Sequence, residues 1–177
     1  MNLKKRSIDI IFCTLALLFL ILPLILISIL VFVSSRESII FFSKRVGKNG
    51  KIFNMPKFRT MKSNTPQVAS HLIKDPDKYI TNLGKFLRQY SLDELPQIFS
   101  VIFGSMSIVG PRPALFNQHN LITLRSKMKI DRIKPGITGW AQINGRDQLS
   151  VKEKVKLDEF YLKNISLKLD FYIILMT

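Results

Sequence analysis

The chain has 177 residues, a length that suits one domain, and a formal net charge of +15, which implies anionic partners. Cys13 is the only cysteine, so an intrachain disulfide and a cysteine-based metal site are excluded. His71 and His119 are too few for a histidine metal site, and any metal is expected to be a hard cation such as Mg²⁺.

An apolar run opens the chain. Ile10 to Val33 gives about 24 residues, enough to cross a bilayer core. Lysine and arginine flank both ends, so the positive-inside rule predicts no orientation. The run is too long for a typical signal peptide, and no small-residue cleavage site follows it. Pro23, near its middle, removes a helical hydrogen bond and favours a kink. The residues alone leave open a spanning helix and a re-entrant one.

The remainder is typical of a small mixed domain. A β-hairpin is predicted, because extended segments flank the turn signal Gly47–Gly50. A polar loop is expected over Ser63–Asp77. The pattern predicts helices over Asn82–Gln89, Leu92–Phe103 and Phe116–Ile130, and from a capping box at Ser150 to about Asn164. The apolar tail Leu167–Met176 suits the core or a membrane interface.

Asp93 and Glu94 form an acidic pair in a chain with only 12 acidic residues. A capping box from Ser91, or Asp93 as N-cap with Pro96 in the first turn, would place the pair at a helix start. Free N–H groups and the helix dipole at that position bind anions and keep a carboxylate ionised. Such a carboxylate can be a nucleophile, hold Mg²⁺ or simply cap the helix.

Cations occur in several clusters that could neutralise phosphoryl oxygens. Arg112 is the most distinctive, because Pro111 and Pro113 restrict its backbone. The other candidates are Lys57, Arg59, Arg88, Lys134 and Arg146. No aromatic and basic platform for single strands is evident, so nucleic acid is not expected as a partner.

Four segments carry a family resemblance: Lys57–Met61 (KFRTM), Ser91–Gln97 (SLDELPQ), Ser107–Pro113 (SIVGPRP) and Lys134–Arg146 (KPGITGWAQINGR). In order and spacing they resemble the bacterial sugar transferases of the small monotopic phosphoglycosyl transferase type. Within that family the chain looks most similar to capsule-synthesis members.

The resemblance implies an activity. Such enzymes transfer a sugar 1-phosphate from a UDP-sugar to undecaprenyl phosphate and release UMP, by a ping-pong mechanism in a surface-glycan pathway. It implies Asp93 as the nucleophile that carries the phosphosugar, and Asp93 with Glu94 at Mg²⁺. Arg88, Arg112 and Arg146 are expected to bind phosphates or the nucleotide, with Lys57, Arg59 and Lys134 as further candidates.

It also implies a fold of the α+β class. A re-entrant membrane helix broken at Pro23 is expected in residues 1–36, and a mostly helical catalytic domain with a short hairpin and interfacial helices in residues 37–177. The expected location is the bacterial inner membrane, with this domain on the cytoplasmic face. The chain ends at Thr177, within what should be a longer C-terminal helix.

Two alternatives accompany this interpretation. A direct glycosyltransferase would release UDP instead of UMP, and a non-enzymatic basic module would bind anions at a membrane. The segments Asn64–Ala69 and Pro113–Gln118 look similar to those of capsule-synthesis members that handle N-acetylated deoxyamino sugars, and this resemblance implies such a sugar as the transferred group.

Overall fold

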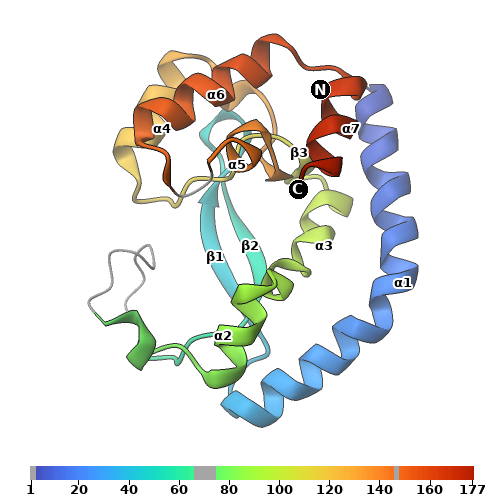
Figure 1. Ribbon diagram of the computed structural model, residues 1–177, viewed down its shortest axis with the longest axis vertical. Helices are drawn as coiled ribbons and strands as arrows, with labels where there is room; N and C mark the ends of the chain where they lie inside the picture. Colours follow the sequence, from blue (N-terminus) through green and yellow to red (C-terminus); the bar gives the residue numbers. More distant parts are fainter. Residues whose placement is uncertain (1–2, 66–74, 146–147) are drawn as a thin grey trace.

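The computed structural model describes residues 3–65, 75–145 and 148–177 (Figure 1). The helices are α1 (Leu3–Ser35), α2 (Asn82–Gln89), α3 (Gln97–Ile102), α4 (His119–Lys127), α5 (Trp140–Ile143), α6 (Val151–Lys163) and α7 (Leu167–Leu175). The strands are β1 (Ile40–Val46), β2 (Ile52–Phe58), β3 (Ser107–Val109) and β4 (Gly136–Thr138). The α+β class and the mostly helical domain with a hairpin are confirmed.

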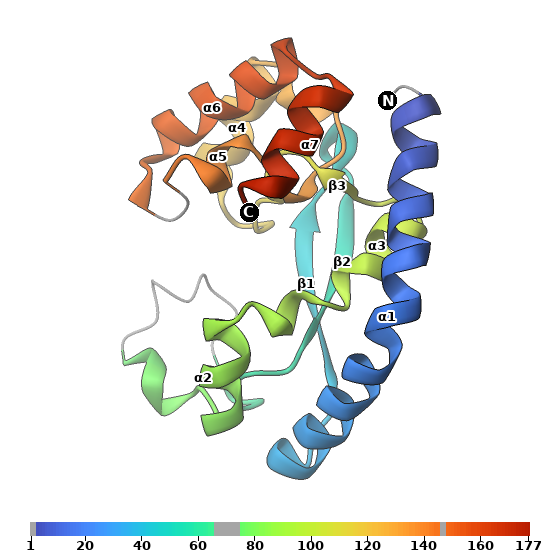
Figure 2. The same ribbon diagram turned by 45° about the vertical axis from the view of Figure 1, so that its right-hand side comes forward.

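The hairpin of β1 and β2 runs through the middle of the molecule, between α2 and the group α4 to α7 (Figures 1 and 2). Its antiparallel register runs from Ile40 opposite Phe58 to Val46 opposite Ile52. Asn49 and Gly50 take left-handed conformations, with φ of 57° and 72°, at the turn. The Asn-Gly signal predicted this turn because these residue types tolerate positive φ.

A second sheet joins two distant segments of the chain. β3 and β4 are parallel, with Ser107 opposite Gly136. A Cβ atom at Gly136 would lie 2.1 Å from the main-chain nitrogen of Gly110, so the two backbones need glycine to approach this closely. The segments that carry Arg112 and Lys134 are therefore joined backbone to backbone.

Helix α1 is continuous from Leu3 to Ser35 and contains Pro23. The expected break at Pro23 is not found; the helix instead bends along its length (Figures 1 and 2). A bend accommodates the proline ring and the one hydrogen bond that Pro23 cannot donate, so the helix need not be interrupted there. Among the described residues, α1 is the one helix long and apolar enough to cross a membrane.

Both ends of α1 contact the same globular body. Near its start, Arg6 donates to the carbonyl oxygens of Val101 and Ile102. Near its end, Ile27 and Val31 are buried in a cluster that includes residues of β2 and α2. Between these ends most of its large apolar side chains are exposed, as at Phe19, which is 82% exposed. The helix is thus fixed at both ends and unpartnered along its outer face.

The remaining helices differ from expectation mainly in their ends. The segment predicted as one helix over Leu92–Phe103 is a 3₁₀ turn, Leu92–Glu94, followed by α3. α4 is shorter than the predicted Phe116–Ile130. The capping box at Ser150 is confirmed, because its hydroxyl accepts from the Glu153 N–H and the Glu153 carboxylate accepts from the Ser150 N–H. Much of the predicted loop Ser63–Asp77 lies outside the described residues.

Candidate active site

Asp93 and Glu94 lie in the 3₁₀ turn between α2 and α3. Ser91 takes a left-handed conformation with φ of 56° and forms no side-chain cap, and α3 begins only after Pro96. The prediction that the pair occupies a helix N-terminus is confirmed in a modified form, because Asp93 and Glu94 lie in a first turn that is 3₁₀ and not α-helical. The left-handed Ser91 separates α2 from this turn, and Leu95 and Pro96 continue in right-handed helical conformation into α3.

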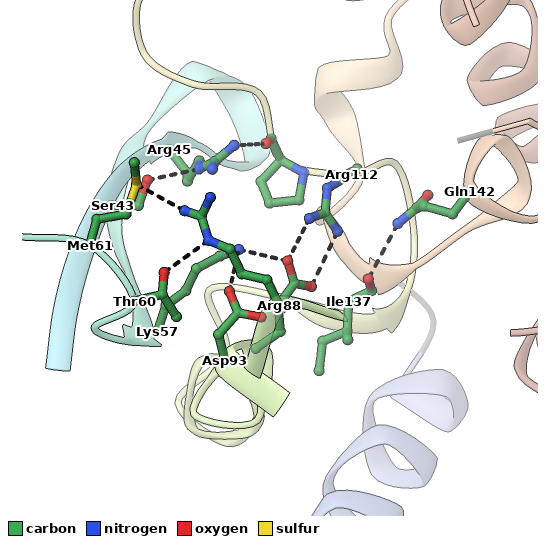
Figure 3. Close-up of polar contacts among 12 residues, drawn as sticks. Ser43, Arg45, Lys57, Thr60, Met61, Arg88, Asp93, Arg112, Ile137 and Gln142 are labelled. Atoms are coloured by element: carbon green, nitrogen blue, oxygen red, sulfur yellow. Dashed lines mark hydrogen bonds and ion pairs between the residues drawn. The ribbon is translucent and has the colours of Figure 1, made fainter. Parts of the chain in front are cut away.

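Glu94 is held by two cations (Figure 3). Its Oε1 atom accepts from Lys57 Nζ at 2.6 Å, and Arg112 donates to both carboxylate oxygens, at 2.5 and 3.3 Å. Burial alone would raise the pKa of Glu94, but the charges of Lys57 and Arg112 outweigh it and lower the pKa from 4.5 to about 2. Glu94 therefore stays ionised and orients both cations.

Asp93 is buried, at 7% exposure, but its carboxylate has few polar contacts. Its Oδ2 atom lies 3.6 Å from Lys57 Nζ, and within the described ranges it accepts no hydrogen bond. Burial raises the pKa of this carboxyl, Glu94 adds to the increase, and Lys57, Arg88 and Arg112 oppose it. This raised pKa runs against the expectation that the helix dipole favours the ionised form of Asp93. A carboxylate with few bonds and little hydration is a good candidate for a nucleophile.

Arg88 reaches this site from the last turn of α2. Its Nε atom donates to Thr60 Oγ1 at 2.9 Å and its Nη2 atom to Met61 Sδ at 3.0 Å (Figure 3). Burial lowers the pKa of the guanidinium, and the charge of Asp93 opposes that change. The structure thus brings together Lys57, Arg88, Arg112, Asp93 and Glu94.

Arg45 is a residue of this site that the sequence reasoning missed. Its guanidinium donates to Ser43 Oγ and to the carbonyl oxygen of Pro113, both at 3.0 Å. Burial, and then the charge of Arg112, lower its pKa to about 10. Strand alternation could have found it, because Arg45 and Lys57 lie on the same face of the hairpin in the observed register.

Two predicted residues lie away from the acidic pair, and a third is outside the described residues. Arg59 pairs with Glu37 at 3.2 Å and donates to the carbonyl oxygen of Ser38. Lys134 lies near Arg6 at the start of α1, against Gly104. Arg146 falls outside the described residues, so its predicted role stays a prediction.

Asp93 and Glu94 suit Mg²⁺ only if other groups complete its coordination. Mg²⁺ is commonly bound by one or two carboxylates together with substrate phosphates and water. Both Glu94 oxygens already accept from Lys57 or Arg112, whereas the Asp93 carboxylate has only its one long contact with Lys57. The described residues hold no group of three or more histidine, cysteine or acidic side chains. Substrate phosphates would therefore have to supply much of the coordination.

The whole chain, residues 1–177, matches the family model described as "Bacterial sugar transferase". It is 36% identical over 191 residues to the exopolysaccharide production protein ExoY of Sinorhizobium fredii, covering 99% of this chain and 84% of that protein. It is 41% identical over 185 residues to the UDP-glucose:undecaprenyl-phosphate glucose-1-phosphate transferase of Escherichia coli. That alignment covers 99% of this chain and 39% of the relative's length. Over 150 residues it is 39% identical to the galactosyl transferase CpsE of Streptococcus agalactiae, and that alignment covers 78% of this chain and 33% of the relative's length.

Proposed function

Because the chain belongs to the bacterial sugar transferase family, we propose that it is a phosphoglycosyl transferase that moves a sugar 1-phosphate from a UDP-sugar to undecaprenyl phosphate and releases UMP. The relative from Escherichia coli is named for this kind of transfer with glucose. The observation that carries the proposal is the buried Asp93 carboxylate, which has one long contact and lies beside three cations.

In the first step an Asp93 carboxylate oxygen attacks the phosphorus that bears the sugar. The new bond joins this oxygen to phosphorus, the bond from phosphorus to the UMP oxygen breaks, and its electron pair leaves with UMP. In the second step an oxygen of the lipid phosphate attacks the same phosphorus, and Asp93 is released as a carboxylate. The two half-reactions are separate, so the kinetics are ping-pong.

The cations at the site have distinct roles in this proposal. Arg112, with a side chain that is 37% exposed, can reach an incoming phosphate while Glu94 holds its guanidinium in place. Lys57 lies between the two carboxylates and offsets the charge that develops on the phosphoryl oxygens. Arg88 approaches from α2, on the opposite flank from Arg112 (Figure 3). Bound Mg²⁺, held by Asp93 or Glu94, would neutralise diphosphate charge.

We extend the proposal to the membrane arrangement. A re-entrant α1 is supported by its contacts, because both ends of the helix bind one globular body, as expected if both ends lie on one side of the membrane. The proposed location is the bacterial inner membrane, with residues 37–177 on the cytoplasmic face. The test replaces Cys13 by serine and places single cysteines at Lys4 or Arg36. Labelling of both positions from the cytoplasmic side supports the re-entrant form, and labelling from opposite sides overturns it.

The sugar is proposed to be an N-acetylated deoxyamino sugar, on the basis of the segments Asn64–Ala69 and Pro113–Gln118. Part of the first segment lies outside the described residues. A panel of UDP-sugars tests this choice directly. Faster turnover of UDP-glucose, the donor in the name of the Escherichia coli relative, would overturn it.

The decisive experiment measures nucleotide release by purified protein supplied with UDP-sugars, undecaprenyl phosphate and Mg²⁺. Wild type is expected to release UMP, and Asp93→Asn none, because an amide cannot form the acyl phosphate. The matched control is Asp77→Asn, an exposed carboxylate whose ion pair with Lys85 is at the surface. Release of UDP would identify a direct glycosyltransferase and overturn the proposal.

A further inference from the structure

A second cationic feature lies away from Asp93. A cavity of about 310 Å³ is enclosed by the first turn of α1, by β3 and the segment before β4, and by the start of α7. Its polar lining comprises Lys4, Lys5, Ser107, Lys134, Tyr161, Ser166 and Asp170. None of these residues makes a described contact with Asp93 or Glu94. The cavity is therefore separate from the candidate active site.

One wall of the cavity is a rigid, fully bonded network. Lys5 Nζ pairs with Asp170 Oδ2 at 2.5 Å and donates to the Tyr161 hydroxyl at 3.2 Å. The same hydroxyl donates to Asp170 Oδ1 at 2.6 Å. Because Asp170 already pairs with Lys5, this wall fixes the cavity's shape and contributes little net charge.

Two cations lie side by side at the cavity: Lys134, which lines it, and Arg6, which is not among its lining residues. Arg6 Nη2 and Lys134 Nζ lie 3.2 and 3.4 Å from the position that a Cβ atom would take at Gly104. Burial lowers the pKa of Lys134 and the charge of Arg6 lowers it further, while Asp9 opposes and Lys48 adds to this effect. Arg6 is used by two main-chain carbonyls, but in the described part of the chain Lys134 has no hydrogen bond or ion pair. A partly buried ammonium beside a like charge is stabilised by an anion.

Apolar side chains surround this charged region. Leu3 is 84% exposed in the first turn of α1, and Ile165 and Leu167, which line the cavity, are 41% and 46% exposed. The cavity also lies at the N-terminal end of the apolar helix α1, where a bilayer surface would meet the protein. A ligand that fits both features has an anionic head and apolar chains.

We propose that this cavity binds the phosphate of an acidic membrane phospholipid, with Lys134 as its main ligand and Lys4 at its edge. The lipid chains then lie along Leu3 and Leu167, on the outside of the protein. This role for Lys134 differs from the binding of donor phosphate. It depends on membrane association of the chain and not on the proposed transfer reaction, so a binding measurement tests it alone.

The experiment measures thermal unfolding of the full chain in a neutral detergent, with phosphatidylglycerol or phosphatidylcholine of the same chains added. Phosphatidylglycerol is expected to raise the Tm of wild type, and phosphatidylcholine is expected to have little effect. Lys134→Gln should weaken the apparent affinity for phosphatidylglycerol about fivefold or more, and Lys134→Arg should preserve it. Lys85→Gln, at an exposed surface pair, is the matched control and should behave as wild type.

A second variant tests the same cavity in case Lys134→Gln does not fold. Lys4→Gln lies at the edge of the cavity and should weaken the same response even where Lys134→Gln does not fold. Equal responses to the two lipids, or an unchanged response in both variants, would overturn the proposal. An equal response to inorganic phosphate would identify a free anion as the ligand, and tighter binding of undecaprenyl phosphate would identify the acceptor; either result overturns the assignment to phospholipid.

Discussion

The guanidinium of Arg125 donates to the main-chain carbonyl oxygen of Arg112 at 2.7 Å. Two other nitrogens of Arg125 bind Asp158 Oδ2, at 2.7 and 2.9 Å, and the Asp158 side chain is 2% exposed. Arg45 holds the next carbonyl, that of Pro113. Two arginines from different elements thus fix the backbone of the Pro-Arg-Pro segment, so the direction of Arg112 depends on helices α4 and α6 as well as on its flanking prolines.

Asp158→Asn should therefore affect both stability and activity. Removing one partner of a buried ion pair leaves a buried charge uncompensated and costs roughly 3 kcal/mol of unfolding free energy. Transfer should fall further through a misplaced Arg112, seen as a raised KM for the UDP-sugar at a temperature where the variant is folded. Glu159→Gln, in the pair with the exposed Lys163 on the same helix, is the control and should cost at most about 0.5 kcal/mol. A normal KM in folded Asp158→Asn would contradict this role.

The rate of the first half-reaction should depend on the protonation of Asp93. Burial raises its pKa above the ordinary 3.8, and only the ionised carboxylate attacks phosphorus, so the rate falls as pH falls through this raised value. Lys57→Gln should move the acid limb to higher pH, because the charge of Lys57 lowers that pKa. The measurement is single-turnover UMP release against pH, with circular dichroism to verify folding. Lys62→Gln, which removes an exposed hydrogen bond to Lys78, should leave the limb in place.

Glu94 should make stability pH-dependent in a defined window. A pKa lowered in the folded protein from 4.5 to about 2 contributes stability that is present above about 4.5 and lost as pH falls toward 2. The shift corresponds to roughly 3 kcal/mol. Chemical denaturation of Glu94→Gln should therefore show a lower unfolding free energy at neutral pH and a shallower loss between pH 5 and pH 2 than wild type. Parallel pH curves for the two proteins would contradict the prediction.

Gly136→Ala should disturb the joint between β3 and β4. The new methyl group would lie 2.1 Å from Gly110 N and 2.3 Å from the carbonyl oxygen of Thr138, so the backbones must separate. We expect a loss of about 2 kcal/mol or more in unfolding free energy. Gly50→Ala is a useful comparison, because nothing lies within 4 Å of its Cβ and only the left-handed φ of 72° is unfavourable, at about 1 kcal/mol. A smaller loss at Gly136 than at Gly50 would contradict the close approach.

Local signals predicted the elements that local chemistry determines. The Asn-Gly turn, the helix Asn82–Gln89 and the capping box at Ser150 are found as expected. The family resemblance read from four segments is confirmed by a match over residues 1–177. The clustering of Lys57, Arg88 and Arg112 around the acidic pair also agrees with the sequence analysis.

Long-range contacts account for what the sequence did not reveal. The helix start at Asp93 is a 3₁₀ turn opened by a left-handed Ser91, and this backbone choice is one among several that the sequence allows. Arg45 and Arg125 were missed because their partners are main-chain carbonyls and a distant aspartate, which no motif spacing identifies. The position of Lys134 beside Arg6 likewise depends on how α1 packs, which residue order alone does not determine.

The attachment of α1 at both ends has a consequence for the acceptor. A helix tied at one end can tilt freely, but one tied at Arg6 and again at Val31 moves only as a unit with the body that carries Asp93. In a bilayer, the immersion depth of the helix would then set the height of the Asp93 carboxylate relative to the lipid phosphates. The catalytic carboxylate would then be held at a fixed height relative to the bilayer. A long polyprenyl chain could remain among the surrounding lipids while only its terminal phosphate moves to react.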